Sequence, residues 1–203
     1  LAITLAAPGA IAAKKETKPK AISGVYKLDT KASEAKWKGS KTLVKSYHEG
    51  TVNVKGGEVE VTDNNIVRGW IELDMTSLKS TDMKGNPKQA DLEGHLKSAD
   101  FFEVEKYPTA KFVITSVKPT ANPTAGVHTH DITGDLTLKD QTHSLTVPAS
   151  ITMQDKTAEA TTQFKLDRTI WNVRYASDKF FKGLGDKVIS NEIEMSLKLK
   201  ATK

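Results

Sequence analysis

The chain has 203 residues, enough to enclose one sizeable apolar core, and the even spacing of its apolar segments gives no reason to divide it. Its net charge of +5 comes almost entirely from lysine, because arginine occurs only as Arg68, Arg168 and Arg174. Lysine attracts anionic lipid or phosphate but lacks the bidentate fork that reads bases, so nucleic-acid binding is disfavoured. The absence of cysteine excludes disulfides, thiolate catalysis and a lipidated anchor cysteine within these residues.

Residues 1–13 carry no charge and end in a small-x-small pattern at Ala10 to Ala12, which is typical of a signal-peptide remnant. They are too short to span a bilayer, which requires about 20 apolar residues. The stretch 14–20 contains lysine and proline and indicates a linker; an ordered segment packed on the domain is the alternative. We therefore expect residues 1–23 to be remnant and linker, residues 24–203 to form one domain, and the protein to be periplasmic or secreted.

Apolar and polar residues alternate along much of the chain, a pattern that predicts strands with one apolar face. The clearest case is 131–139, where Ile132, Gly134, Leu136 and Leu138 share one parity. The same alternation recurs in 52–54, 59–61, 67–75, 112–114, 145–151, 164–166 and 193–199. These strands predict an all-β domain around a single apolar interior. That interior could be packed solid or left hollow for an apolar ligand, and we expect it to be hollow.

Two turns are predicted early in this series. The pair Gly56-Gly57 lies between two alternating runs, so we expect a two-residue hairpin loop that places Val54 opposite Val59. Residues 63–65, taken as a three-residue loop, would keep the apolar faces aligned across the next hairpin.

The pairing across that second loop can be stated by residue. It places Val61 opposite Val67 and Glu60 opposite Arg68, so that valine meets valine and opposite charges meet. A loop of two or four residues would set Arg68 against a valine instead.

A short helix interrupts the strands. Asn86 followed by Pro87 resembles an N-cap with proline at the first helical position, and Leu92 and Leu96 share a face at i, i+4. We expect the helix to lie between two strands.

Aromatic residues follow this helix. Phe101 and Phe102 could plug the mouth of a barrel or anchor the helix as ordinary core residues. His95 could hydrogen-bond a ligand head group, although a structural role at the helix C-terminus is favoured for a cationic side chain.

Several segments together resemble the YceI-like family. The string HLKSADFFEVEKYPTAKF over 95–112 resembles its signature, and 132–138 with 145–147, 166–175 and 193–197 resemble its later blocks. This resemblance implies a lipocalin-like, extended antiparallel β-barrel of about eight strands, exported to the periplasm, with a long isoprenoid or fatty amide chain in its lumen. The chain departs from the family pattern at Lys139-Asp140 and at Asn172, both in loops or bends. The turn after Leu138 is centred either on 139–140 or on 140–141.

No pattern for enzymatic chemistry stands out. Nucleophile-elbow, metalloprotease, phosphate-loop and calcium-loop motifs are missing from the sequence, and Gly183-Leu-Gly185 lacks the third glycine of a dinucleotide site. His128 and His130 would share one face of a strand, but no third ligand is adjacent, so we expect no metal.

We therefore expect a non-catalytic carrier or storage protein for a polyisoprenoid or related lipid, which is a ligand and not a cofactor. The expected partners are this lipid and, transiently, an anionic membrane surface; a homodimer is left open. A lumenal isomerase or hydrolase and a structural envelope protein with a filled core are the alternatives. The residues expected to contact the ligand are Trp37, Val67, Ile71, Leu73, His95, Phe101, Phe112, Ile114, Leu136, Leu138 and Trp171.

Overall fold

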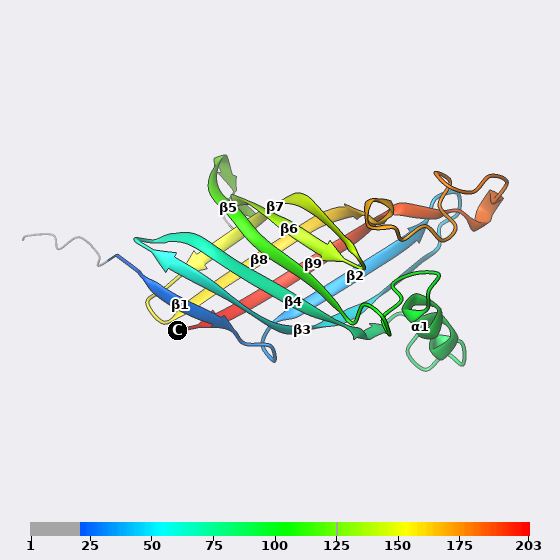
Figure 1. Cartoon of the computed structure of the whole chain (residues 1–203), viewed down its shortest axis with the longest axis horizontal. Coiled ribbons are helices and arrows are strands. Elements are labelled where there is room, and N and C mark those ends of the chain that lie inside the picture. Colours follow the sequence, from blue (N-terminus) through cyan, green and yellow to red (C-terminus); the bar gives the residue numbers. More distant parts are fainter. Residues whose placement is uncertain (1–20, 125) are drawn as a thin grey trace, which may run out of the picture.

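The computed structural model of the chain describes residues 21–124 and 126–203. The predicted signal-peptide remnant and most of the linker therefore lie outside the described residues, and the division at residue 23 stays a prediction. The described part is all-β, as predicted, with one short α-helix and two 3-10 turns (Figure 1). The elements are β1 (Gly24–Leu28), β2 (Glu34–Lys41), β3 (Tyr47–Thr62), β4 (Asn65–Ser80), α1 (Gln89–Lys97), β5 (Thr109–Thr124), β6 (His128–Leu138), β7 (Gln141–Met153), β8 (Thr157–Asp167), η1 (Arg168–Trp171), η2 (Gly185–Lys187) and β9 (Ile189–Thr202).

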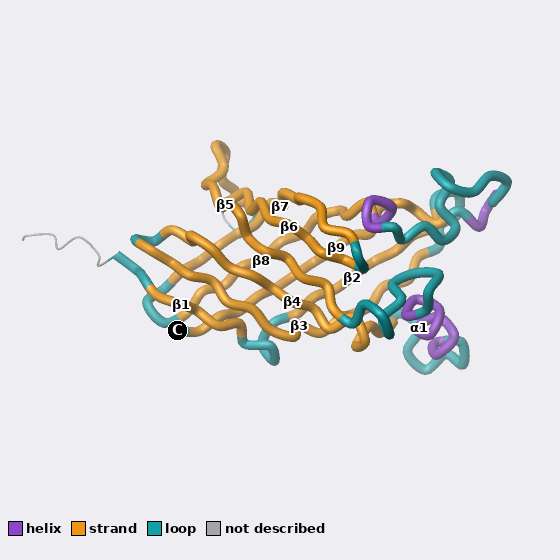
Figure 2. The backbone as a smooth tube through the Cα atoms, in the orientation of Figure 1, coloured by secondary structure: helices purple, strands orange, loops and turns teal. Residues whose placement is uncertain are grey.

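The strands close into a ring. Neighbouring strands follow the order β3-β2-β9-β8-β7-β6-β5-β4, and β4 pairs back with β3. The short strand β1 also pairs with β3 and β9, but at the opposite end of the barrel from β2. β1 and β2 thus share one position in an eight-position ring, and the predicted barrel of about eight strands is confirmed. Figure 2 shows the strands crossing obliquely along an elongated tube, with the helices and most long loops at one end.

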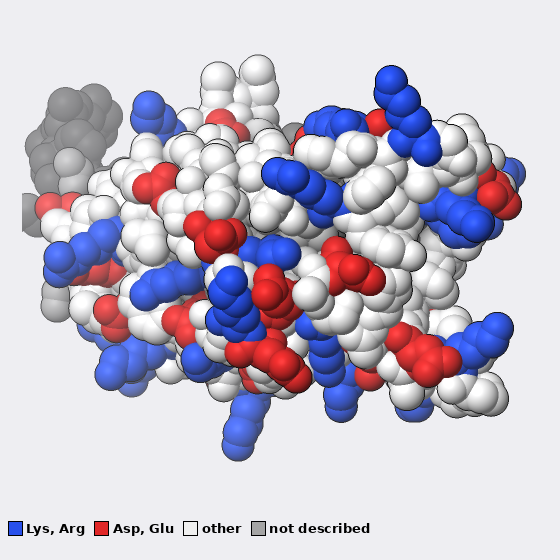
Figure 3. All heavy atoms as spheres, turned by 45° about the vertical axis from the view of Figure 1, so that its right-hand side comes forward, with Lys and Arg blue, Asp and Glu red and all other residues white. Residues whose placement is uncertain are grey.

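The barrel wall separates a charged exterior from an apolar interior, as the alternating sequence predicts. Outward-facing positions on the strands carry lysine and glutamate, and Figure 3 shows blue and red side chains spread over the wall. Cross-strand ion pairs join neighbours on this face, such as Lys55 with Glu72 at 2.8 Å and Lys200 with Glu159 at 3.1 Å. Such exposed pairs contribute little stability, so the fold depends mainly on the inner face.

The predicted hairpin at Gly56-Gly57 is wrong. β3 runs without interruption through both glycines, and Gly57 pairs with Ile71 of β4. Neither glycine has the positive φ that a type I′ turn requires at both central positions. Gly57 instead permits close packing, because a Cβ there would lie 2.5 Å from Cδ1 of Leu28 and 2.6 Å from the carbonyl oxygen of Trp70.

The next turn is one residue shorter than predicted. Asp63 and Asn64 form the loop alone, with φ values of 49° and 67°. The predicted pairing of Glu60 with Arg68 is confirmed, but Val61 pairs with Ile66 and not with Val67. The register shift at this point makes Val67 the extra residue of a β-bulge, which turns it away from the interior.

The predicted short helix is present, but it begins at Gln89 and not directly after Asn86. The side chain of Asn86 accepts a hydrogen bond from the backbone N–H of Lys88 at 2.9 Å, so it forms a turn before the helix. α1 lies at one end of the barrel (Figure 1). In the described part of the chain, no helix is long and apolar enough to cross a membrane.

The end of the barrel opposite α1 is filled by its own side chains. Tyr26 of β1 is fully buried there, and its hydroxyl donates to the carbonyl oxygens of Gln154 and Asp155 at 3.2 and 3.0 Å. Burial and the nearby Asp155 carboxylate raise the pKa of Tyr26, so its hydroxyl keeps its proton. Val61, Ala158 and Ala201 are the other buried residues of this packed cluster. The residues around Tyr26 therefore close this end of the barrel.

Candidate ligand-binding site

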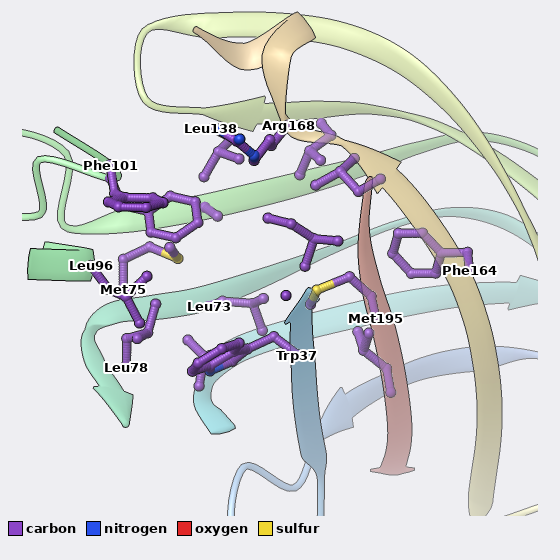
Figure 4. Close-up of a pocket in the computed structure, with 18 of the residues that line it drawn as sticks. Trp37, Leu73, Met75, Leu78, Leu96, Phe101, Leu138, Phe164, Arg168 and Met195 are labelled. Carbon is purple, nitrogen blue, oxygen red and sulfur yellow. The ribbon is translucent and has the colours of Figure 1, made fainter. Parts of the chain in front are cut away.

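A cavity of about 370 Å³ occupies the part of the barrel nearer α1. Its volume falls in the range of roughly 300–1,000 Å³ that is usual for small-molecule sites. Inward-facing side chains from all eight strands β2 to β9 line it, together with residues of α1 and the segment after it. Figure 4 shows Leu73, Phe164 and Met195, which come from different strands, pointing into this space, with Trp37 below Leu73. The lining is almost entirely apolar.

The side chains that point inward do not fill the interior. Leu73, Leu136, Leu145 and Phe164 all line the cavity, yet each remains partly accessible although it lies inside the wall. In a solid core these residues would be fully buried, because protein interiors pack as densely as organic crystals. The predicted hollow interior is therefore present.

The cavity opens at the α1 end. The exposed residues that touch it are Lys41, Ser46, Tyr47 and Tyr175, and all of them lie in or next to the loops at that end. None of the residues in the cluster around Tyr26 lines the cavity. The described residues therefore form a lumen with one mouth.

The helix and the two phenylalanines cover part of this mouth. Leu92 and Leu96 of α1 share the face that lines the cavity, as their spacing predicts. Phe101 and Phe102 are 7% and 8% exposed, belong to the main core cluster and also line the cavity. Both expected roles, anchoring the helix and covering the mouth, apply to them.

Most of the residues expected to contact a ligand lie around the lumen. Those that line it are Trp37, Ile71, Leu73, His95, Phe101, Phe112, Ile114, Leu136 and Leu138. Val67 and Trp171 do not. The expectation for Val67 is wrong because the bulge turns it outward, where it is 53% exposed.

Trp171 is buried but serves the rim of the barrel. Its indole Nε1 donates to the carbonyl oxygen of Leu136 at 2.8 Å, and its ring meets His143 edge-on at 5.5 Å. It lies in the 3-10 turn η1, which follows β8 and packs against β7. The expectation that Trp171 faces the lumen is therefore wrong: it closes the rim over the β6–β7 hairpin.

A glycine makes room for one of the lumen aromatics. Gly134 lies on the inward face of β6, where a Cβ would stand 2.5 Å from Cζ of Phe112. The Phe112 ring therefore lies across the glycine and not across a neighbouring side chain. This explains why the alternating segment 131–139 has a glycine at one of its apolar positions.

Arg168 is a site residue that the sequence reasoning missed. Its side chain is 1% exposed, and its guanidinium donates to the carbonyl oxygens of Val173 at 2.7 Å, Ser190 at 2.9 Å and Ile189 at 3.1 Å. Burial lowers the pKa of Arg168. The guanidinium lies at the lumen wall (Figure 4) and holds the segment after β8 against β9. The signal in the sequence that could have drawn attention to Arg168 is the scarcity of arginine in this lysine-rich chain.

His95 lies at the mouth and contacts aromatic residues. Its Nε2 is 3.0 Å from Oδ2 of Asp100, and its ring meets Phe101 and Tyr175 edge-on at centroid distances of 5.1 and 4.6 Å. The helix end is capped by the Ser98 side chain, which donates to the His95 carbonyl oxygen. The expected capping role thus belongs to Ser98, and the imidazole lines the lumen.

A second histidine stabilises the same end. Asp82 lies 2.8 Å from the Nδ1 of His48 and accepts hydrogen bonds from Ser80 Oγ and the Glu49 N–H. Burial of Asp82 raises its pKa, but these hydrogen bonds and the charge of His48 outweigh it, so the pKa is lowered. The carboxylate ties the start of β3 to the end of β4.

The remaining histidine pair, His128 and His130, contacts neighbouring polar side chains. His128 Nε2 is 2.8 Å from Asp131 Oδ1, and His130 Nδ1 is 2.8 Å from Thr129 Oγ1. Burial lowers the pKa of His130. No group of three or more histidine, cysteine, aspartate or glutamate side chains gathers to hold a metal within residues 21–124 and 126–203.

A closed antiparallel barrel with a hollow, apolar lumen defines the lipocalin-like class, in which an eight-stranded barrel can hold one small ligand. Two solved structures share the fold. BcnA of Burkholderia cenocepacia is 19% identical, with a TM-score of 0.61 over 86% of this chain and 99% of that one. A polyisoprenoid binding domain from Saccharophagus degradans is 12% identical, with a TM-score of 0.57 over 87% and 97%.

The family within this class follows from the sequence. The model of the YceI-like domain matches residues 26–201, so the chain belongs to the YceI-like family, as the resemblance predicted. A UPF0312 protein of Pseudomonas putida is 36% identical over 138 residues, and the match spans 67% of this chain and 66% of that protein. A UPF0312 protein of Pseudomonas savastanoi is 43% identical over 67 residues, which cover 33% of this chain and 32% of that protein.

Proposed function

We propose that this protein binds a polyisoprenoid or another long-chain lipid, such as a fatty amide, in its lumen and acts as a non-catalytic periplasmic carrier or storage protein. The observation that carries the proposal is the hollow lumen, which is almost entirely apolar and open at one end. The structural similarity to the polyisoprenoid binding domain from Saccharophagus degradans supports the same ligand class.

The energetics favour exchange over permanent capture. Moving a forty-carbon chain from water into the lumen would yield roughly 30 kcal/mol at ~0.8 kcal/mol per methylene. This exceeds the ~20 kcal/mol at which non-covalent affinities saturate. The lipid, however, starts in a bilayer as apolar as the lumen, so the net transfer is nearly balanced and ordering costs count against binding. A carrier that takes up and returns lipid fits this balance.

The polar end of the ligand belongs at the mouth. Deeper in the lumen nearly all the side chains are apolar, whereas Lys41, Tyr47, His95 and Tyr175 line the opening. These residues offer a cation, hydroxyls and an imidazole to a head group. Selectivity would therefore come from the shape of the tube along the tail and from these few groups at its end.

Charges placed inside the lumen test the proposal. Leu73→Lys and Leu136→Glu each put a charged group against the bound chain, so we expect both variants to lose co-purifying lipid. Thr137→Lys is the matched control, because Thr137 points outward and hydrogen-bonds Thr142 at 2.8 Å. Mass spectrometry of an organic extract measures retention, and circular dichroism verifies that each variant folds.

Each outcome distinguishes a different function. Equal lipid retention in all three variants would contradict binding in the lumen. A wild-type extract without any lipid would favour the structural envelope protein, and conversion of added lipid by the purified protein would favour an enzyme. The periplasmic or secreted address is tested separately by cell fractionation.

A further inference from the structure

Large apolar side chains are exposed at the mouth of the barrel. They lie in two segments that we call the rim loops: 41–47, from the last residue of β2 to the first residue of β3, and 172–188, between η1 and β9. Leu43 is 67% exposed, Phe180 44% and Phe181 48%. Exposed apolar groups that gather at one place usually mark an interaction site.

The two rim loops are joined at their bases and form one projection. Lys41 pairs with Ile189, and the N–H of Thr42 donates to the carbonyl oxygen of Val188 at 3.1 Å, so the loops are joined at their bases (Figure 1). Val173 and Ser177 of the longer loop are fully buried, and the N–H groups of Phe180 and Phe181 both donate to the Ser177 carbonyl oxygen. The exposed phenylalanines therefore stand on a packed base.

The rim loops are also basic. They carry Lys41, Lys45, Arg174, Lys179, Lys182 and Lys187 against Asp178 and Asp186, a net charge of +4 from six positive and two negative groups. Figure 3, which brings this end forward, shows lysine and arginine side chains standing out from it. Lys179 pairs with Asp167 at 2.6 Å, but Lys45, Lys182 and Lys187 are exposed. The projection thus combines aromatic tips with positive charge.

We propose that the rim loops dock the barrel on an anionic phospholipid bilayer, with Phe180, Phe181 and Leu43 entering the interface and the lysines facing the head groups. Aromatic and aliphatic groups flanked by lysine match the two components of an anionic membrane surface. A second copy of this chain fits less well, because a symmetric contact would bring two basic projections together.

Docking in this orientation would place the lumen against the membrane. Lys41, Tyr47 and Tyr175 belong to the rim loops and also line the cavity. A lipid could then pass between bilayer and lumen with little exposure to water. This transfer role depends on the proposed function, whereas docking depends only on the rim loops.

A single cysteine probe tests the docking directly, because the chain contains no cysteine. The full chain carrying F181C is labelled with an environment-sensitive nitrobenzoxadiazole dye and mixed with vesicles of phosphatidylcholine, with or without phosphatidylglycerol. We expect the fluorescence to rise severalfold with the anionic vesicles and the rise to fall at high salt. V67C is the matched control, since Val67 is 53% exposed near the closed end, and its signal should not change.

Charge reversal provides an independent measurement. K45E/K182E should weaken flotation with anionic vesicles at least tenfold while the lumen still retains its lipid. An unchanged F181C signal, an equal rise at V67C, or a rise with protein concentration in the absence of vesicles would each overturn the proposal. The L136E variant separates the two hypotheses, because it should lose lumenal lipid and still dock.

Discussion

Whether a side chain of this barrel faces the lumen depends more on its position in a strand than on its residue type. Leu73 and Leu136 could be assigned to the lumen from alternation alone, because a strand without irregularities keeps its parity. Val67 could not be assigned in this way, because it is the extra residue of a β-bulge. A bulge shifts the alternation by one residue, so the residues beyond it face the opposite side from the one that alternation predicts. Trp171 could not either, because it leaves the strand pattern at a 3-10 turn that only the packing of the rim determines.

Arg168 provides the sharpest prediction for a single residue. In Arg168→Met the carbonyl oxygens of Val173, Ile189 and Ser190 lose their donor inside the protein. Each buried acceptor left unpaired costs about 1–3 kcal/mol, so we expect a loss of roughly 3 kcal/mol in the free energy of unfolding. Urea denaturation measures it.

Arg174→Met is the control for this change. Arg174 is exposed, and its guanidinium lies over the ring of Phe180 at 4.6 Å. Its replacement should cost about 1 kcal/mol or less. If Arg168→Met were no more destabilising than Arg174→Met, the anchoring role of Arg168 would be refuted.

At the level of strands and turns, the sequence predicts which residues of a strand face inward better than it predicts where the strand ends. Gly56-Gly57 has the composition of a hairpin loop, yet the two residues lie within the 16-residue strand β3. Glycine signals either a turn or a close approach, and only the contact with Leu28 and Trp70 distinguishes the two. After β6 the turn is centred on Lys139-Asp140, one of the two expected positions, with Lys139 at a φ of 56°.

The pairing of β5 with β6 depends on the glycine beneath Phe112. In Gly134→Val, the new side chain would meet the Phe112 ring and the Val113 carbonyl oxygen, both 2.5 Å from the Cβ position. We expect a loss of about 1–3 kcal/mol in stability from overpacking. The displaced ring should also enter the lumen and reduce lipid retention. Thermal melting and mass spectrometry of the extract measure the two effects.

Gly94→Ala on α1 serves as the comparison. A Cβ at Gly94 would have no heavy atom within 4 Å, and the helix gains from alanine. This variant should be neutral or more stable by up to about 1 kcal/mol. A similar loss in both variants would show that the space under Phe112 is not the cause.

For the whole molecule, the hollow interior implies a cost in stability. The apolar residues around the lumen lack partners on one side, and those contacts are forfeited in the empty protein. The sequence could predict one apolar interior, but not its division into a hollow part and a filled part. That division depends on Tyr26 of β1, whose hydroxyl reaches the β7–β8 turn. β1 is a short strand that shares one position of the ring with β2.

Filling the lumen should therefore stabilise the empty protein at the expense of binding. Ala160 lines the cavity, so Ala160→Leu adds apolar volume to open space, and we expect a gain of about 0.5–2 kcal/mol together with lower lipid retention. Ala201→Leu is the matched change in the packed cluster around Tyr26, where Ala201 is 3% exposed. Overpacking there should cost about 1–3 kcal/mol. Denaturation of lipid-free protein measures both, and a loss in both would contradict a hollow lumen.

The cluster around Tyr26 closes one end of the barrel, and under the proposed function this determines how a lipid enters and leaves. A long chain can enter such a tube only tail first, and the end that goes in last must come out first. The membrane that donates the lipid and the membrane that accepts it must both use the same opening, so the protein cannot contact both at the same time. The protein would work as a shuttle that leaves one membrane before it serves the next, and not as a conduit between two.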